Sequence, residues 1–123
     1  MNGTGATGMV LMALALAACS GAGETRTRAV PSGDPERGLR IMNEVGCGSC
    51  HAIPGIDWPQ GRVGPPLSGM GGRALIGSGL PNRPETLIPY LMNAPVADPG
   101  SAMPPMPISE EEARDIAAYL YEH

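Results

Sequence analysis

The stretch Cys47-Gly48-Ser49-Cys50-His51 lies near the middle of this 123-residue chain, and it contains two of the three cysteines. Two thiols three positions apart, followed directly by an imidazole, are found in covalent haem attachment, zinc sites, redox-active cysteine pairs and structural disulfides. A zinc site needs four ligands, and only Cys19 and His123 remain outside the motif. A thioredoxin-like redox pair needs a βαβ setting, which this sequence lacks. The spacing therefore favours attachment of a haem.

Haem attachment gives a role to each reactive residue of the motif. The thiols of Cys47 and Cys50 each add to one haem vinyl group to form a thioether, and His51 then ligates the iron through Nε2. The chain contains no Phe and only 3% aromatic residues, whereas Gly and Pro number 18 and 14. A covalently fixed haem supplies the large apolar body that such a sequence otherwise lacks. We therefore expect one haem c at the centre of the fold.

Length and charge restrict the remaining possibilities. A chain of 123 residues predicts a single domain. The formal net charge of −4 argues against a nucleic-acid partner, because phosphate binding needs a basic surface. No apolar run reaches the length of about 18 residues that a membrane-spanning helix needs.

The N-terminal residues predict an export signal. Met9–Ala18 is apolar and has the length of a secretory h-region, so residues 1–18 are interpreted as a signal peptide. The run ends in Leu16-Ala17-Ala18-Cys19, which resembles the lipobox of bacterial lipoprotein precursors. That resemblance implies lipidation of Cys19. The alternative is an ordinary signal peptide cut near Cys19, which leaves a free thiol.

The segment after the signal lacks apolar periodicity. Residues 19–33 are rich in Gly, Ala, Ser and Thr, and we interpret them as a flexible tether. The folded domain is then expected to cover residues 34–123. A domain this small has a marginal core unless a cofactor adds to it.

Helix signals stand at both ends of this domain. Asp34-Pro35 provides an N-cap and a proline in the first turn of a helix that runs to Val45, where Gly46 ends it. Ser109 and Glu112 form a capping box at the start of a last helix that reaches about Glu122.

The middle of the domain predicts one further helix and long loops. The helix covers Pro84–Asn93, with Asn82 as its expected cap and Pro89 as an interior residue that would kink it. Residues 52–81 are rich in Gly and Pro and show no strand-like alternation. The predicted fold class is therefore all-α with long irregular loops. Loops of this length in a compact domain usually have a function, such as holding a cofactor.

Several short motifs, in this order, resemble the small class I cytochromes c, above all those that accompany bacterial respiratory oxidases. Besides the haem motif they are Val63-Gly64-Pro65-Pro66-Leu67, Gly72-Arg73, Leu80-Pro81-Asn82, Glu85-Thr86-Leu87, Pro99-Gly100-Ser101-Ala102-Met103-Pro104 and Ser109–Leu120. The resemblance covers about residues 34–121. It implies a cytochrome c fold, with N- and C-terminal helices that cross at Gly38 and Tyr119 and long loops wrapped around one covalently bound haem.

The resemblance also implies a methionine on the iron opposite His51. In the family this methionine precedes a proline and keeps a nearly constant sequence separation from an aromatic residue of the last helix, a pattern that Met103 matches. Met106, three residues later, is the alternative ligand or a haem-packing side chain. Met42 is better interpreted as a core residue that packs against Tyr119. A thioether ligand favours ferrous iron and raises the reduction potential.

The residues expected to support the iron ligands follow from the same resemblance. The carbonyl of Pro65 would accept the Nδ1–H of His51, which fixes the tautomer of the imidazole. Arg73 would pair with a haem propionate, or it is a solvated loop arginine.

Three further side chains are expected near the haem. Tyr90 would lie close to the methionine sulfur, and Ser101 could reach a propionate. Trp58 would either cover the haem edge or pack under a loop.

These expectations describe a one-electron carrier and not an enzyme, since iron with six ligands offers no open position to a substrate. No catalytic residue and no small-molecule substrate are expected. The expected donor is a quinol-oxidising complex or a dehydrogenase, and the expected acceptor is a terminal oxidase. The protein would be lipid-anchored on the periplasmic side of a bacterial membrane, or else soluble in the periplasm.

Two other functions compete with this prediction. One is a haem-c sensor or peroxidase-like enzyme whose sixth ligand is easily displaced. The other is a fixed electron-entry subunit of an oxidoreductase complex. The chain contains no Lys, so docking through a ring of lysines is not expected.

Overall fold

The computed structural model describes residues 28–123. The predicted signal peptide and Cys19 lie outside these residues. Helices dominate the fold, as predicted, and within residues 28–123 none is both long and apolar enough to cross a membrane. The elements are α1 (Pro35–Val45), η1 (Cys47–Ser49), η2 (Met70–Gly72), β1 (Leu75–Ile76), β2 (Leu80–Pro81), α2 (Pro84–Met92), α3 (Ala94–Ala97) and α4 (Glu110–Glu122).

The start and end of α1 confirm the prediction. The Asp34 side chain accepts a hydrogen bond from the backbone N–H of Arg37, which caps the first turn. Gly46 has a φ of 85°, and its N–H donates to the Met42 carbonyl oxygen. This left-handed conformation favours glycine, and it ends the helix just before Cys47.

The predicted capping box at the start of α4 is also confirmed. The Ser109 N–H donates to Glu112 Oε2 at 2.7 Å, and the Glu112 N–H donates to Ser109 Oγ at 3.2 Å. The hydrogen bond from the Ser109 backbone holds the pKa of the Glu112 carboxyl below its ordinary value. These local bonds fix the first turn of α4.

The prediction that Asn82 caps α2 is wrong. Arg83 occupies the N-cap position, without a side-chain hydrogen bond. Asn82 is buried instead, where its amide donates to the carbonyl oxygens of Met70 and Arg73, and its side-chain oxygen accepts from the Tyr121 hydroxyl. A buried amide with these partners joins η2 to α4.

A short hairpin between η2 and α2 was not predicted. Strands β1 and β2 have two residues each and pair antiparallel, with Leu75 opposite Pro81 and Ile76 opposite Leu80. Gly77, Ser78 and Gly79 connect them, and we call these three residues the hairpin turn. Both glycines have a positive φ, of 54° and 126°. Pairs this short carry no alternation that a sequence could reveal.

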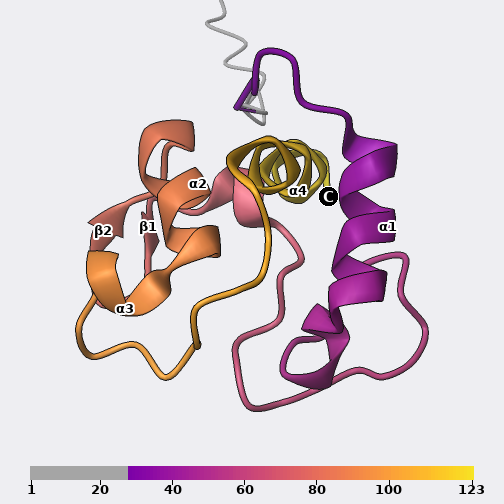
Figure 1. The fold of residues 1–123 in the computed structure, drawn as a ribbon, viewed down its shortest axis with the longest axis horizontal. Coiled ribbons are helices and arrows are strands. Elements are labelled where there is room, and N and C mark those ends of the chain that lie inside the picture. Colours follow the sequence, from indigo (N-terminus) through magenta and orange to yellow (C-terminus); the bar gives the residue numbers. More distant parts are fainter. Residues whose placement is uncertain (1–27) are drawn as a thin grey trace, which may run out of the picture.

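Helices α1 and α4 pack against each other. A Cβ on Gly38 would lie 2.5 Å from the carbonyl carbon of Asp115, so the helices approach with no room for a side chain. Arg37 bridges them through ion pairs with Glu111 and Asp115. Figure 1 shows α1 along the right side and α4 nearly end-on beside it. The chain runs down α1 and reaches η1 at the bottom of the view.

The residues that precede α1 also lie on α4. Arg28 donates to the Gly71 carbonyl oxygen at 2.7 Å, and its guanidinium stands 5.7 Å from the centre of the Tyr121 ring. A Cβ on Gly33 would come within 2.7 Å of the Ala118 Cβ. We call residues 28–33 the N-terminal strap. The predicted domain boundary at Asp34 stays a prediction.

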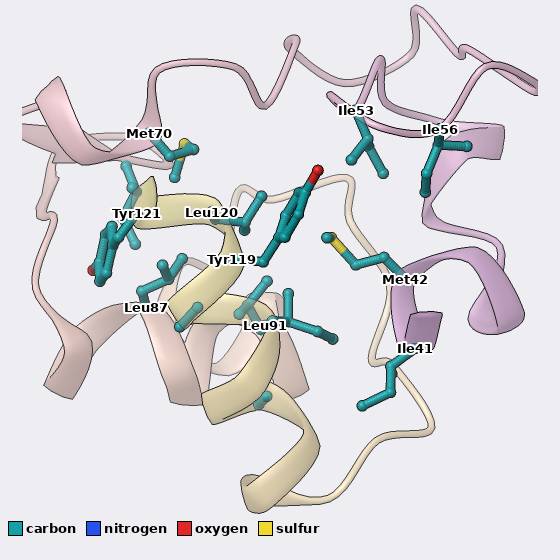
Figure 2. Close-up of a cluster of buried hydrophobic side chains, with 14 residues drawn as sticks. Ile41, Met42, Ile53, Ile56, Met70, Leu87, Leu91, Tyr119, Leu120 and Tyr121 are labelled. Carbon is teal, nitrogen blue, oxygen red and sulfur yellow. The ribbon is translucent and has the colours of Figure 1, made fainter. Parts of the chain in front are cut away.

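The buried core forms around the last two turns of α4. In Figure 2 Tyr119 points toward Met42, Ile53 and Ile56, whereas Tyr121 lies beside Met70 and Leu87. Tyr119 is 5% exposed and Met42 is 1% exposed, in agreement with the interpretation of Met42 as a core residue. The Tyr119 hydroxyl donates to the Pro54 carbonyl oxygen at 2.7 Å, which ties the segment after His51 to α4.

Candidate haem-binding site

The first thiol of the motif, Cys47, follows the end of α1 after one residue, Gly46. Cys47 begins η1, and its carbonyl oxygen accepts hydrogen bonds from the N–H groups of Cys50 and His51. Cys50 is exposed, Cys47 is half-buried, and both thiols are free. Burial raises the pKa of the Cys47 thiol. A reactive redox pair needs a lowered pKa, so this environment does not favour that alternative.

The imidazole of His51 is held by a backbone carbonyl. Its Nδ1 lies 2.7 Å from the carbonyl oxygen of Pro65. A carbonyl oxygen can only accept, so Nδ1 carries a proton, and in the neutral form of the imidazole the lone pair is then on Nε2. The backbone therefore selects the tautomer that a metal needs at Nε2.

Glycine at position 64 lets the loop approach this imidazole. A Cβ on Gly64 would lie 2.6 Å from Nδ1 and 2.9 Å from Nε2 of His51. The Gly64 N–H donates to the Cys50 carbonyl oxygen at 2.8 Å, which fixes the loop to the motif. In the sequence Gly64 stands out only as part of the motif Val63–Leu67. No local sequence signal marks Gly64 as a site residue, because the loop and the imidazole meet only in the fold.

The other side of the domain contributes residues 98–109, which connect α3 to α4 and which we call the methionine loop. Met103 is half-buried and packs against the hydrophobic core cluster. Its N–H donates to the Ser101 side-chain oxygen at 3.2 Å, and that oxygen also lies 3.2 Å from the Tyr90 hydroxyl. The structure thus brings together Tyr90, Ser101 and Met103, three of the predicted site residues.

Met106 lies in the same loop but has a different backbone anchor. Its N–H donates to the carbonyl oxygen of Met92, at the end of α2, at 2.9 Å. Its own carbonyl oxygen accepts from the Ile108 N–H. Met103 packs against the core cluster, whereas the choice between Met103 and Met106 as the ligand stays a prediction.

Arg73 and Trp58 complete the set of predicted residues. The guanidinium of Arg73 donates to the carbonyl oxygens of Pro66 and Ser68, at 2.6 and 3.0 Å. Arg73 therefore ties down the end of the loop that holds His51, and its role toward a propionate stays a prediction. Trp58 is 83% exposed, which excludes packing under a loop.

The residues of this site fit haem c. The candidate donors are two free thiols, an imidazole whose Nδ1 is occupied and, as predicted from the sequence, a thioether on a separate loop. Because Gly64 has no Cβ, the backbone of the loop can pack directly against the imidazole of His51. Within residues 28–123 no three His, Cys, Asp or Glu side chains gather to hold a metal ion.

A family model described as Cytochrome C oxidase, cbb3-type, subunit III matches residues 33–120, most of the chain. The protein belongs to this family. It is a class I c-type cytochrome, and its cofactor is one covalently bound haem c. Among curated proteins no match to the chain is found. The family match decides between the chemistries that the motif left open, and it gives this cytochrome a role in electron transfer.

Replacing Gly64 by Ala is expected to disturb the imidazole of this cytochrome. The new Cβ would overlap both ring nitrogens of His51, so either the ring or the loop must move. We expect the variant to attach haem covalently but to show a changed spin state in its absorption spectrum. Gly72→Ala is the matched control, because no atom lies within 4 Å of the added Cβ. An unchanged spectrum in Gly64→Ala would contradict the packing described above.

Proposed function

We propose that this cytochrome is a one-electron carrier whose haem iron would be held by His51 and Met103. The terminal helices α1 and α4 form the helix crossing of the cytochrome c fold, and the loops between them wrap around the haem. The bound haem supplies an iron that changes between the ferrous and ferric states. With both His51 and Met103 as ligands the iron would offer no open position to a substrate, which suits electron transfer.

The observation that carries this proposal is the hydrogen bond between His51 Nδ1 and the Pro65 carbonyl oxygen. In the neutral imidazole it directs the lone pair to Nε2, on a residue adjacent to the two thiols. Because the acceptor belongs to the backbone, it keeps the imidazole oriented in both oxidation states. A fixed ligand lowers the structural change that accompanies each electron transfer.

In this proposal Met103 would be the second protein ligand of the iron. It lies on a loop whose prolines limit the conformations of the unfolded chain, so ordering the loop costs less entropy. Ser101 holds the backbone of Met103, Tyr90 contacts the Ser101 hydroxyl, and Arg73 holds the loop on the His51 side. Cys47 and Cys50 form the two thioethers.

The proposed partners are respiratory redox proteins. A quinol-oxidising complex or a dehydrogenase reduces the carrier, and a terminal oxidase accepts the electron. We further propose that Cys19 carries the lipid that anchors the protein on the periplasmic side of the membrane. A tether raises the effective concentration of the partners, which offsets the absence of lysines for electrostatic steering.

The proposal is tested by optical spectroscopy of the protein made in a host that matures haem c. We expect a low-spin spectrum in both oxidation states, a weak far-red band in the oxidised state that marks methionine ligation, and no binding of carbon monoxide to the reduced protein. A redox titration should follow a single one-electron curve.

Two results would contradict the proposal. A wild-type protein that is high-spin and binds carbon monoxide would favour a sensor or peroxidase-like enzyme. A protein that releases its haem into acidified organic solvent would show that the thioethers are absent. Cys50→Ser, which keeps one thiol, is the control for partial attachment.

A further inference from the structure

The most buried acid near the methionine loop is Asp98, the first residue of that loop. It is only 6% exposed, although aspartates are rarely buried without a partner. Its N–H donates to the Ala94 carbonyl oxygen at 2.8 Å, so its backbone ends α3. The function proposed above gives this residue no role.

The Asp98 carboxylate is bound entirely by the hairpin turn and its own loop. Its Oδ2 accepts the backbone N–H of Ser78 at 2.8 Å, and its Oδ1 accepts the Ser78 hydroxyl at 2.8 Å. These bonds, together with one from the Gly100 backbone, hold the pKa of the Asp98 carboxyl below its ordinary value. Hydrogen bonds to an ionised acceptor are stronger than those between neutral groups.

The hairpin turn fits closely over this carboxylate. A Cβ on Gly77 would lie 2.6 Å from Asp98 Oδ2 and 3.0 Å from the ring of Tyr90. Only glycine permits that approach, and the φ of 54° at Gly77 also favours glycine. The turn therefore contacts both Asp98 and the tyrosine whose hydroxyl lies beside Ser101.

A short series of bonds leads from Asp98 to Met103. The Asp98 carbonyl oxygen accepts the Ser101 N–H at 2.8 Å, which closes a turn with Pro99 at its second position, where proline is favoured. The Ser101 side-chain oxygen then accepts the Met103 N–H at 3.2 Å. The same residue is thus fixed to the hairpin by its side chain and to the methionine loop by its backbone.

We propose that Asp98 is a positioning residue, which clamps the hairpin turn to the methionine loop and thereby holds Met103 in its ligating place. This inference rests on the proposed ligation by Met103. A hairpin of two-residue strands has little stability of its own, so its attachment to Asp98 also orders the turn that covers Tyr90. The bonds of Asp98 to Ser78 and Ser101 oppose the opening of the methionine loop, so Asp98 acts on Met103 through the loop.

The test measures how easily an external ligand displaces Met103. Imidazole is titrated into the oxidised wild-type protein and into Asp98→Ala, Ser78→Ala and the double variant, and urea unfolding is followed in parallel. Asp34→Ala is the matched control, because it removes an aspartate that accepts a local backbone hydrogen bond at the start of α1. Imidazole binds only after the loop opens, so its affinity reports the opening equilibrium.

We expect Asp98→Ala to bind imidazole about tenfold more tightly than the wild type, the effect of losing a hydrogen-bonded carboxylate. Ser78→Ala should show a smaller gain, since it removes one bond of the pair. The double variant should match Asp98→Ala, because both residues act through the same contact. Asp34→Ala should unfold at lower urea concentration without any change in imidazole affinity.

The outcomes separate the inference from the proposed function. If Asp98→Ala lowers stability as Asp34→Ala does but leaves imidazole affinity unchanged, the residue is merely structural and the inference fails. Should Asp98→Ala fail to fold, an unchanged affinity in Ser78→Ala overturns it equally. If the wild type has no far-red band, and Met103→Ala binds imidazole no more tightly than the wild type, the proposed ligation itself is wrong.

Discussion

Met103→Ala is expected to abolish the far-red absorption band of the oxidised protein and to open the iron to external ligands. The alanine side chain has no atom that can bind iron, so the reduced variant should become high-spin and bind carbon monoxide. The loss of the thioether, which favours ferrous iron, should lower the reduction potential by on the order of 100 mV. Absorption spectra with and without carbon monoxide, and a redox titration, measure these changes.

The matched control for this variant is Met106→Ala, three residues along the same loop. Met106 is held through its backbone N–H, which the substitution keeps, so the band and the potential should stay as in the wild type. A band that survives Met103→Ala and disappears in Met106→Ala would transfer the ligand role to Met106. The two variants together therefore assign the sixth ligand without ambiguity.

Gly38→Ala is expected to destabilise the whole fold. The added Cβ would lie 2.5 Å from the carbonyl carbon of Asp115 and 2.9 Å from the Ile116 nitrogen. Both atoms belong to the backbone of α4 and cannot rotate away, so the two helices must separate. We expect a loss of about 3 kcal/mol in the free energy of unfolding, the upper part of the range for overpacking, which urea unfolding of the haem-loaded protein measures.

Gly72→Ala is again the control for this substitution. It lies on the exposed surface with free space around the added Cβ, and it should leave the stability unchanged or raise it slightly. The absorption spectrum of folded Gly38→Ala should match that of the wild type, because the helix contact lies outside the donor set. If Gly38→Ala unfolds at the same urea concentration as the wild type, the close packing of α1 and α4 is wrong.

The features that the sequence predicted well are local along the chain. The caps of α1 and α4 depend on residues within one helical turn, so Asp34, Gly46 and Ser109 could be interpreted without a structure. The haem motif is equally compact, because both thiols and the imidazole fall within five consecutive residues. The family match agrees with the interpretation of that motif.

The features that the sequence did not reveal depend on distant partners. Asn82 has the side chain of a cap, but Met70, Arg73 and Tyr121 satisfy its amide in the core. Asp98 bonds to Ser78, and no local pattern connects these two positions. Hydrogen bonds between remote segments follow from the fold, so propensity and spacing cannot predict them.

The backbone contacts of the haem site show the same limit. The resemblance placed the Pro65 carbonyl beside His51, but the need for glycine at position 64 became visible only when the ring and the loop were placed together. The roles predicted for Arg73, Tyr90 and Ser101 toward the haem stay predictions. Their protein contacts show how each residue holds a loop.

The N-terminal strap determines where a mechanical load would enter the domain. Arg28 is fastened to η2 and to the face of Tyr121, and Gly33 lies against Ala118. A pull that arrives at residue 28 is therefore transferred first to α4, while the thiols stand beyond the far end of α1, about 16 Å along its axis. A pull on the strap would therefore act on η2 and the last turns of α4 before it reached the thiols.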